Sequence, residues 1–233
     1  MSVGTRPPDG RRIAIDDEIV DRLLCGLLVA ADVAVTQATE AVAAATTLGR
    51  ELAERFGDRQ PSRIEGLTEA RSLYKSCGMD PSRHRPSSEA LLRRAMRGKE
   101  LYHINNVVDC CNLASLRFLL PIGLYDLSRL TGDVTLRLGR DDEAYAGIRK
   151  GPVHLAGRLG LFDDEGPFGS PTSDSARTRV TASTRGVLAV VMATAAYPPA
   201  AMARNLDVFA ADLTRYCAAG SVWQAVLGAG AAS

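Results

Sequence analysis

The chain has 233 residues and a mass of 24.8 kDa, which fits one large domain or one domain with a smaller attachment. Hydrophobic residues make up 46% of it and charged residues 24%, a composition that excludes long disordered or fibrous segments. The formal net charge of +1 excludes a global electrostatic field that gathers nucleic acid. Any RNA contact must therefore use a local basic patch.

The sequence also lacks the usual signals of a membrane or secreted protein. No stretch reaches the roughly 18 uncharged apolar residues that a membrane helix needs, and residues 1–12 have no apolar segment typical of a secretion signal. The five cysteines form no Cys-x-x-Cys pair and no Cys/His spacing that suits zinc. We expect a reduced, cytoplasmic protein with no metal and no cofactor, which contacts neither a membrane nor DNA.

The first eighty residues contain two predicted strands followed by two predicted helices. Prolines and glycines in residues 1–12 indicate a flexible arm. Apolar and β-branched runs predict strands, whereas stretches rich in alanine, leucine and charged residues predict helices. In chain order these elements are a strand at 13–15, a strand at 27–35, a helix at 38–56 and a helix from 61 to about 75.

The rest of the chain begins with helices and then becomes rich in strands. Pro81 and Pro86 bound an extended basic connector, because the residue before a proline is pushed out of helical geometry. Ser87 suits the N-cap of the next helix, and Asn105 or Asn106 caps the one after it. The predicted elements are helices at 87–97, 106–118 and 199–216, and strands at 101–104, 134–138, 143–148, 153–162, 179–181 and 186–195.

This order of elements predicts an α+β fold rather than a regularly alternating α/β sheet. We expect a strand-rich core of mixed or antiparallel sheets, flanked by helices. The predicted parts are a flexible arm at 1–12, an N-terminal strand–helix extension packed on the core at 13–80, the main domain at 81–218 and a C-terminal tail at 219–233.

A basic cluster follows the connector. Four of its arginines are candidates for contacts with RNA phosphates, because they lie close together in the sequence and only Glu89 and Glu100 oppose them. The alternative is a solvated helix face with an ordinary N-cap. The four candidates are Arg83, Arg85, Arg93 and Arg94.

A polar stripe runs along the helix predicted at 106–118. Asn105, Asp109 and Asn112 share one face at helical spacing, while most of the remaining residues of this stretch are apolar. Buried amides and carboxylates must form hydrogen bonds. They either bond a neighbouring backbone or line a cavity that recognises a polar ligand. The adjacent Cys110 and Cys111 are expected to be buried apolar residues rather than nucleophiles.

A long segment at 163–175, predicted as a loop, combines hydroxyls, glycines and a late carboxylate. Loops of this length in compact domains are usually functional or disordered, and Phe168 is an unusual residue for a disordered tip. The candidate residues are Gly169, Ser170, Thr172, Ser173 and Asp174, which could orient a water or an ester carbonyl. The alternative is a turn whose hydroxyls bond their own backbone.

None of the widespread catalytic or cofactor motifs occurs in the chain. There is no G-x-S-x-G elbow, Walker loop, H-E-x-x-H or dinucleotide fingerprint. His84, His103 and His154 are scattered, and each is expected to be structural rather than a catalytic base.

Residues from about 83 to 191 resemble the editing and tRNA-binding domain of the β subunit of phenylalanyl-tRNA synthetase. They resemble even more closely the stand-alone proteins built around that domain. The strongest match is Asn-Val-Val-Asp-Cys-Cys-Asn at 106–112 followed by Pro-Ile-Gly-Leu-Tyr-Asp at 121–126. The synthetase domain has Asn-Val-Val-Asp-x-x-Asn and then Pro-Leu-His-x-Phe-Asp at the same distance. The stand-alone proteins add residues 85–91 and the loop at 166–175. The resemblance covers about half of the chain.

The resemblance implies a free-standing deacylase that hydrolyses the ester of mischarged tRNA in trans. Asn112 and Asp174 would position water and substrate, and tRNA would be the partner. Gly123 stands where the synthetase has a histidine, which removes a group that could orient the water and is expected to enlarge the pocket. The implied substrate contacts are Asp109, Gly123, Gly169, Ser170, Thr172 and Ser173.

Such hydrolysis requires no nucleophile triad. The α-ammonium group activates an aminoacyl ester, so the protein must only place a water, stabilise the oxyanion and exclude the wrong side chain. Two other functions stay open at this point. One is a non-catalytic module that binds tRNA, an amino acid or a protein, which Gly123 favours. The other is a hydrolase of small esters that uses no RNA.

Overall fold

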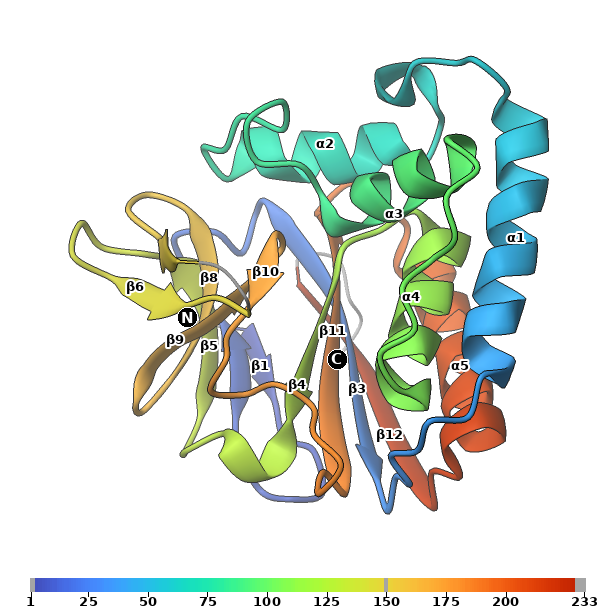
Figure 1. The fold of residues 1–233 in the computed structure, drawn as a ribbon. Helices are drawn as coiled ribbons and strands as arrows, with labels where there is room; N and C mark the ends of the chain where they lie inside the picture. Colours follow the sequence, from blue (N-terminus) through green and yellow to red (C-terminus); the bar gives the residue numbers. More distant parts are fainter. Residues whose placement is uncertain (1–2, 149–150, 229–233) are drawn as a thin grey trace.

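The computed structural model describes residues 3–148 and 151–228, and these form an α+β fold of helices packed on mixed and antiparallel sheets (Figure 1). The fold class predicted from the sequence is confirmed. The helices are α1 (Glu40–Phe56), α2 (Leu67–Ser76), α3 (Ser87–Met96), α4 (Asn106–Phe118) and α5 (Pro199–Cys217), with short 3-10 turns at Pro61–Arg63 and Leu127–Arg129.

The strands of the described residues form three sheets. The six-stranded sheet has the order β1 (Val3–Thr5), β2 (Ile13–Ile15), β5 (Val134–Leu138), β8 (Leu159–Asp163), β9 (Gly166–Ser170) and β10 (Ser173–Asp174). The four-stranded sheet has the order β12 (Ser221–Gly228), β3 (Leu23–Ala31), β11 (Gly186–Thr194) and β4 (Ile122–Asp126). The third sheet pairs β6 (Ala144–Ala146) with β7 (Pro152–His154). Among the named strands of the described residues, only β2 and β5 pair in parallel.

Strand β3 separates two hydrophobic cores. Its side chains alternate between the faces of the sheet, so Cys25 and Leu27 face the six-stranded sheet while Leu24 and Leu28 face the helices. A strand buried on both faces reads as a continuous apolar run. Gly26 lets α5 pack closely, since a Cβ atom there would lie 2.7 Å from Sδ of Met202.

Helices α4 and α5 pack on one face of the four-stranded sheet, and α1 packs on the side of α4 that faces away from the strands (Figure 1). Helix α4 is buried on two sides, because Val107 and Ala114 pack on the sheet while Leu113 and Leu116 pack on α1 and α3. Helix α2 closes one end of the core between the two larger sheets. The central position of α4 makes its few polar side chains candidates for a site.

Several boundaries predicted from the sequence are wrong. The predicted flexible arm contains β1, which pairs with β2 from Val3↔Ile15 to Thr5↔Ile13. The predicted tail contains β12, which pairs with β3 along its whole length; residues 229–233 lie outside the described residues. The elements of 13–80 do not form a separate extension, because β3 lies inside the four-stranded sheet.

Five predicted local elements also differ. The strand expected at 27–35 begins at Leu23 and ends at Ala31, before Asp32 turns the chain with a φ of 57°. Gly157, with a φ of 62°, divides the strand expected at 153–162 into β7 and β8. The loop expected at 163–175 contains β9 and β10, and Phe168 is fully buried there. Residues 101–104 and 179–181 form no strand.

Candidate functional site

A cavity of about 530 Å³ lies between α4, the edge strand β4 and the segment that carries β10. Its volume falls within the usual range for small-molecule sites. Asn112 and Asp174, which are 62 positions apart in the sequence, both line it. The other lining residues are Ser87, Leu91, Ile104, Val108, Cys111, Ser115, Ile122, Leu124, Ile148, Arg179 and Val180.

Asn112 is the member of the predicted polar stripe that reaches this cavity. It lies in the middle of α4, and its neighbours Val108 and Cys111 contribute apolar lining. Within the described residues, its side-chain amide makes no hydrogen bond. One donor and one acceptor group are therefore available to a molecule in the cavity.

Asp174 brings a carboxyl group to the opposite wall. Strand β10 places it, since Asp174 pairs with Gly169 of β9. Burial raises the pKa of the Asp174 carboxyl to about 7, while the Tyr125 hydroxyl and the backbone N–H of Leu124 act in the opposite direction. A carboxyl group with this pKa exchanges protons near neutral pH, as a general acid or base requires.

The Tyr125 side chain lies behind Asp174 on the other face of β4. Its ring packs edge-on against Phe168, with 4.8 Å between the ring centroids. A Cβ atom at Gly123 would lie 2.1 Å from the Tyr125 oxygen, and one at Gly169 would lie 2.2 Å from it. Both glycines therefore make room for the phenol. The sequence predicts that Gly123 enlarges the cavity. This prediction is wrong, because the Tyr125 side chain occupies the space beside Gly123.

The Tyr125 hydroxyl is also unusual in its bonding. It is fully buried and has no hydrogen-bond partner of ordinary geometry among the described residues. Burial is the main cause that raises the pKa of Tyr125 above its ordinary value. The neighbouring carboxylate of Asp174 raises this pKa further. The contact between the Tyr125 hydroxyl and the Asp174 carboxyl group is electrostatic, because the two groups do not meet the geometry of a hydrogen bond.

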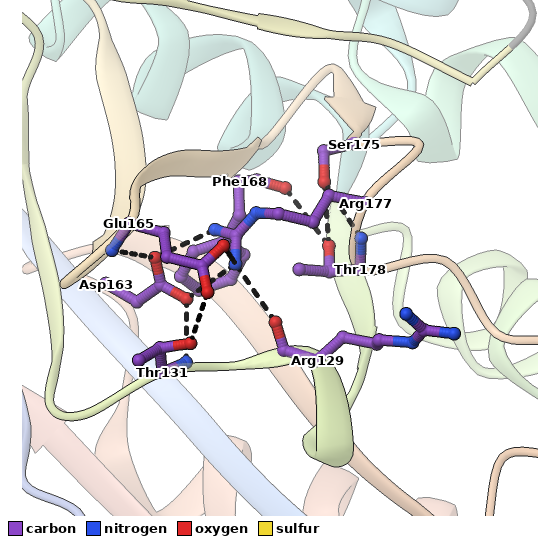
Figure 2. Close-up of polar contacts among 8 residues, drawn as sticks. All are labelled: Arg129, Thr131, Asp163, Glu165, Phe168, Ser175, Arg177 and Thr178. Atoms are coloured by element: carbon purple, nitrogen blue, oxygen red, sulfur yellow. Dashed lines mark hydrogen bonds and ion pairs between the residues drawn. The ribbon is translucent and has the colours of Figure 1, made fainter.

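A polar network holds the strands that carry Asp174 (Figure 2). Arg177 binds the buried carboxylate of Asp163 through two N–H groups, at 3.0 and 2.8 Å, and also contacts Glu165 at 3.3 Å. The backbone carbonyl of Arg129 accepts a further bond from Arg177, and Thr131 donates to both acidic residues. The bidentate pair fixes the turn of the β8–β9 hairpin, where β8 ends at Asp163, against the segment that follows Asp174.

Asp109 belongs to a different environment from Asn112. Its carboxylate accepts from the backbone N–H of Ile104 at 3.1 Å and lies 2.6 Å from Nδ1 of His103. Burial raises the pKa of Asp109, and the contact with His103 opposes the rise. Asn105, the third residue of the stripe, caps α4 by accepting from Val108 N at 3.0 Å. Asn112 therefore lines a cavity, whereas Asn105 and Asp109 bond neighbouring groups of the protein. Each of the two interpretations of the stripe holds for part of it.

The hydroxyl residues expected at the site face away from the cavity. Ser170 bonds the Tyr145 hydroxyl at 2.9 Å, and Thr172 bonds the Tyr74 hydroxyl at 3.0 Å. The Ser170 hydroxyl also accepts weakly from the backbone N–H of Ser173, at 3.3 Å. Neither these residues nor Asp109, Gly123 and Gly169 line the cavity. The self-bonded turn therefore describes Ser170, whose hydroxyl bonds the backbone of Thr172 and Ser173, whereas the Thr172 hydroxyl bonds a distant tyrosine.

The four arginines expected to form one patch divide into separate groups. Arg93 and Arg85 face Glu89, at 2.8 and 3.8 Å, whereas the guanidinium group of Arg94 lies 3.7 Å from the ring centroid of Tyr102. The side chain of Arg83 is 84% exposed and is 3.8 Å from Asp80.

Cys110 and Cys111 are buried, as expected. Burial raises the pKa of the Cys111 thiol, and the nearby Asp174 raises it further, so the thiol stays protonated at neutral pH. The described residues contain no group of three His, Cys, Asp or Glu side chains that could hold a metal ion. None of the helices in the described ranges is both long and apolar enough to cross a membrane.

Sequence reasoning missed Tyr125, Arg179 and Ser87. Ser87 suits an N-cap by its sequence, but it makes no capping bond, and its hydroxyl lies buried without a partner at the cavity wall. The Gly-x-Tyr spacing of Gly123 and Tyr125 was a usable signal, since residues two apart share one face of a strand. No sequence signal indicated Arg179, which lies in irregular structure.

This fold and cavity define an α+β domain with a ligand-sized site between a buried helix and the edge of a sheet. Residues 69–216, more than half of the chain, match the B3/4 domain model. The chain therefore belongs to the B3/4 domain family.

One solved structure and the curated proteins add to this comparison. The chain is similar to the crystal structure of an N-terminal fragment of the phenylalanyl-tRNA synthetase β-subunit from Pyrococcus horikoshii, at 13% identity and a TM-score of 0.40. That match covers 87% of this chain and 48% of the synthetase fragment, so this chain spans about half of its length. None of the curated proteins compared with the chain matches it.

Proposed function

We propose that this B3/4 domain binds tRNA and hydrolyses the ester of mischarged aminoacyl-tRNA in trans. The observation that carries the proposal is the cavity that Asn112 and Asp174 line together. The motif at 106–112 singles out Asn112 independently of the cavity, and Asp174 belongs to the loop in which the resemblance places the carboxylate of the site. The domain family, and the likeness of two sequence motifs to the synthetase editing domain, support the choice of an aminoacyl ester as substrate.

The cavity suits an amino acid in both shape and chemistry. Val108, Ile122 and Leu124 offer apolar surface to a side chain, while Asn112 and Asp174 offer polar groups to the ester and the ammonium group. The Asn112 amide would donate to the ester carbonyl as negative charge develops on its oxygen. The Asp174 carboxylate would orient the attacking water and take its proton. The protonated carboxyl group would then return this proton to the ribose oxygen as the ester bond breaks, a role that suits a pKa of about 7.

No covalent intermediate with the protein is part of this proposal. Three side chains of the described lining carry a thiol or hydroxyl, namely Cys111, Ser87 and Ser115. The raised pKa of Cys111 keeps its thiol protonated. Neither serine is hydrogen-bonded to a base, because the Ser87 hydroxyl has no partner among the described residues and the Ser115 hydroxyl donates to the Leu120 carbonyl. Water is therefore the nucleophile. The aminoacyl ester carries its own activating ammonium group, so placement of the water and of the oxyanion supplies the rate enhancement.

A panel of mischarged tRNAs tests the activity, with loss of the ester followed over time. Asn112→Ala should lower the turnover rate about 100-fold, the usual effect of removing one oxyanion donor, with tRNA affinity retained. Asn205→Ala is the matched control, because Asn205 lies on α5 and bonds Tyr197 rather than lining the cavity. Equal rates for the two variants would remove Asn112 from the mechanism. No ester loss above background with any folded wild-type sample would refute the activity.

A non-catalytic binding module is the second candidate. Gly123 favours it, because no side chain can replace the family histidine there without meeting Tyr125. Among the described residues that line the cavity there is no histidine. Such a module would bind deacylated and mischarged tRNA equally and would show no turnover for Asn112→Ala to reduce.

A third candidate is a hydrolase of small esters that uses no RNA. The salt dependence of its substrate affinity distinguishes it from a tRNA deacylase. Phosphate contacts make the affinity for nucleic acid fall steeply as the salt concentration rises. A substrate affinity that does not change between low and high salt would favour small esters over tRNA.

A further inference from the structure

A second, polar pocket of about 360 Å³ lies between α2, the connector that follows it and α3. Three arginines line it, and they come from three different elements. Arg71 belongs to α2, Arg85 to the connector and Arg93 to α3. Glu89 lies in the same wall, in the first turn of α3.

Glu89 orients two of these arginines. Its carboxylate is only 1% exposed, and each of its oxygens accepts one charge-assisted hydrogen bond. Nη1 of Arg71 lies 2.8 Å from Oε2, and Nε of Arg93 lies 2.8 Å from Oε1. Nε of Arg85 is farther away, at 3.8 Å. A buried carboxylate with two such donors holds both guanidinium planes in fixed positions.

The pocket carries more positive charge than Glu89 can balance. Three guanidinium groups against one carboxylate leave a formal excess of two positive charges. The neighbouring pair of Arg83 and Asp80, 3.8 Å apart, adds no net charge. Charges in a concave site are screened less than charges on an open surface. The excess therefore favours an anion in this pocket.

The unused donors suit a tetrahedral oxyanion. Each guanidinium group has five N–H donors in a planar fork. Among the described residues, Arg93 uses Nε alone in a side-chain bond, and Arg71 uses Nη1 toward Glu89 and Nη2 toward the Ser82 hydroxyl at 3.5 Å. Arg85 is 48% exposed, and within the described ranges its side chain makes only the long contact with Glu89. The Ser82 hydroxyl lines the same wall.

We infer that this arginine pocket, lined by Arg71, Arg85 and Arg93 around Glu89, binds a phosphate group. It is separate from the candidate cavity, because α3 directs Ser87 and Leu91 toward the cavity and Glu89 and Arg93 toward the arginine pocket. The phosphate belongs either to an RNA backbone or to a small phosphorylated molecule. The RNA source rests on the proposed function, whereas the site itself does not.

The test uses one arginine of the pocket and one exposed arginine of α5. Arg85→Gln removes one charge from the pocket and leaves both short bonds to Glu89 in place, so the variant is expected to fold. Arg204→Gln makes the same change on an exposed residue of α5 that does not line the pocket. Full-length wild type and both variants are titrated with inorganic phosphate, by calorimetry, and with deacylated tRNA at several salt concentrations.

Arg85→Gln should weaken binding of the phosphate-bearing ligand about 10-fold, and Arg204→Gln should leave it within about twofold. With tRNA, the slope of log K against log salt should fall by about 1 for Arg85→Gln alone, the loss of one phosphate contact. A selective effect with tRNA identifies RNA as the source. A selective effect with inorganic phosphate alone identifies a small ligand.

Equal affinities of both variants and wild type for both probes would overturn the inference, and so would no binding of either probe to folded wild type. These results are independent of ester hydrolysis. If the wild type deacylates tRNA and Arg85→Gln binds both probes as well as wild type does, the proposed function stands and the phosphate site is refuted. A protein that binds phosphate without deacylation keeps the site alone.

Discussion

Replacement of Asp174 by asparagine should change how the stability of the protein depends on pH. In the unfolded chain this carboxyl has its ordinary pKa of 3.8, and in the folded protein burial raises the pKa to about 7. Between these values the folded protein keeps a proton that the unfolded chain releases. The contribution of Asp174 to stability is therefore fully present below pH 3.8 and falls as the pH rises toward 7.

The size of the effect follows from the two pKa values. A difference of about three units corresponds to about 4 kcal/mol, of which about 2.5 kcal/mol falls between pH 5 and pH 8. Water that enters the cavity hydrates the carboxylate and reduces this amount, so these are the largest values expected. Asp174→Asn has no proton to lose, and relative to wild type it should gain stability over this interval.

Urea denaturation at pH 5 and pH 8 measures the difference. Trp223 is the only tryptophan of the chain and packs against the core between the sheets, so its fluorescence reports unfolding. The free energy of unfolding of Asp174→Asn minus that of wild type should rise by up to about 2.5 kcal/mol from pH 5 to pH 8. Asp141→Asn, a change of an exposed aspartate, controls for the substitution itself. A difference that is the same at both pH values for Asp174→Asn would refute the raised pKa.

Two further substitutions test how the site is supported. Gly123→Ala places a Cβ atom 2.1 Å from the Tyr125 oxygen, and we expect it to lower the free energy of unfolding by about 2 kcal/mol. Arg177→Ala leaves a buried carboxylate without its bidentate partner, and we expect a loss of about 3 kcal/mol. Urea denaturation at pH 7 measures both effects.

Each of these variants has a control in the chain. Gly151→Ala adds the same methyl group where no atom lies within 4 Å, and it should change stability by less than about 0.5 kcal/mol. Arg129→Ala removes a guanidinium group that takes no part in the network of Figure 2, where Arg129 contributes its carbonyl oxygen. A loss in either control as large as in its partner variant would contradict the assigned contacts.

Composition and periodicity were enough to predict the fold class and most of the helices. Helix α4 follows from its apolar faces and from Asn105, whose side chain caps it as predicted. The motif at 106–112 also singled out Asn112. These features depend on neighbours in the sequence, whose spacing sets the helical face to which each residue belongs.

The tertiary structure alone decided which polar residues share a site. Asn112 and Asp174 meet because β10 pairs with β9 near the edge strand β4, while Ser170 and Thr172 turn toward Tyr145 and Tyr74. Residues far apart in sequence come together through strand order, and local spacing does not determine that order. The sequence predicts a flexible arm at 1–12 and a tail at 219–233, but these segments contain the strands β1 and β12. Local spacing did not reveal these strands, because their partners β2 and β3 lie elsewhere in the chain.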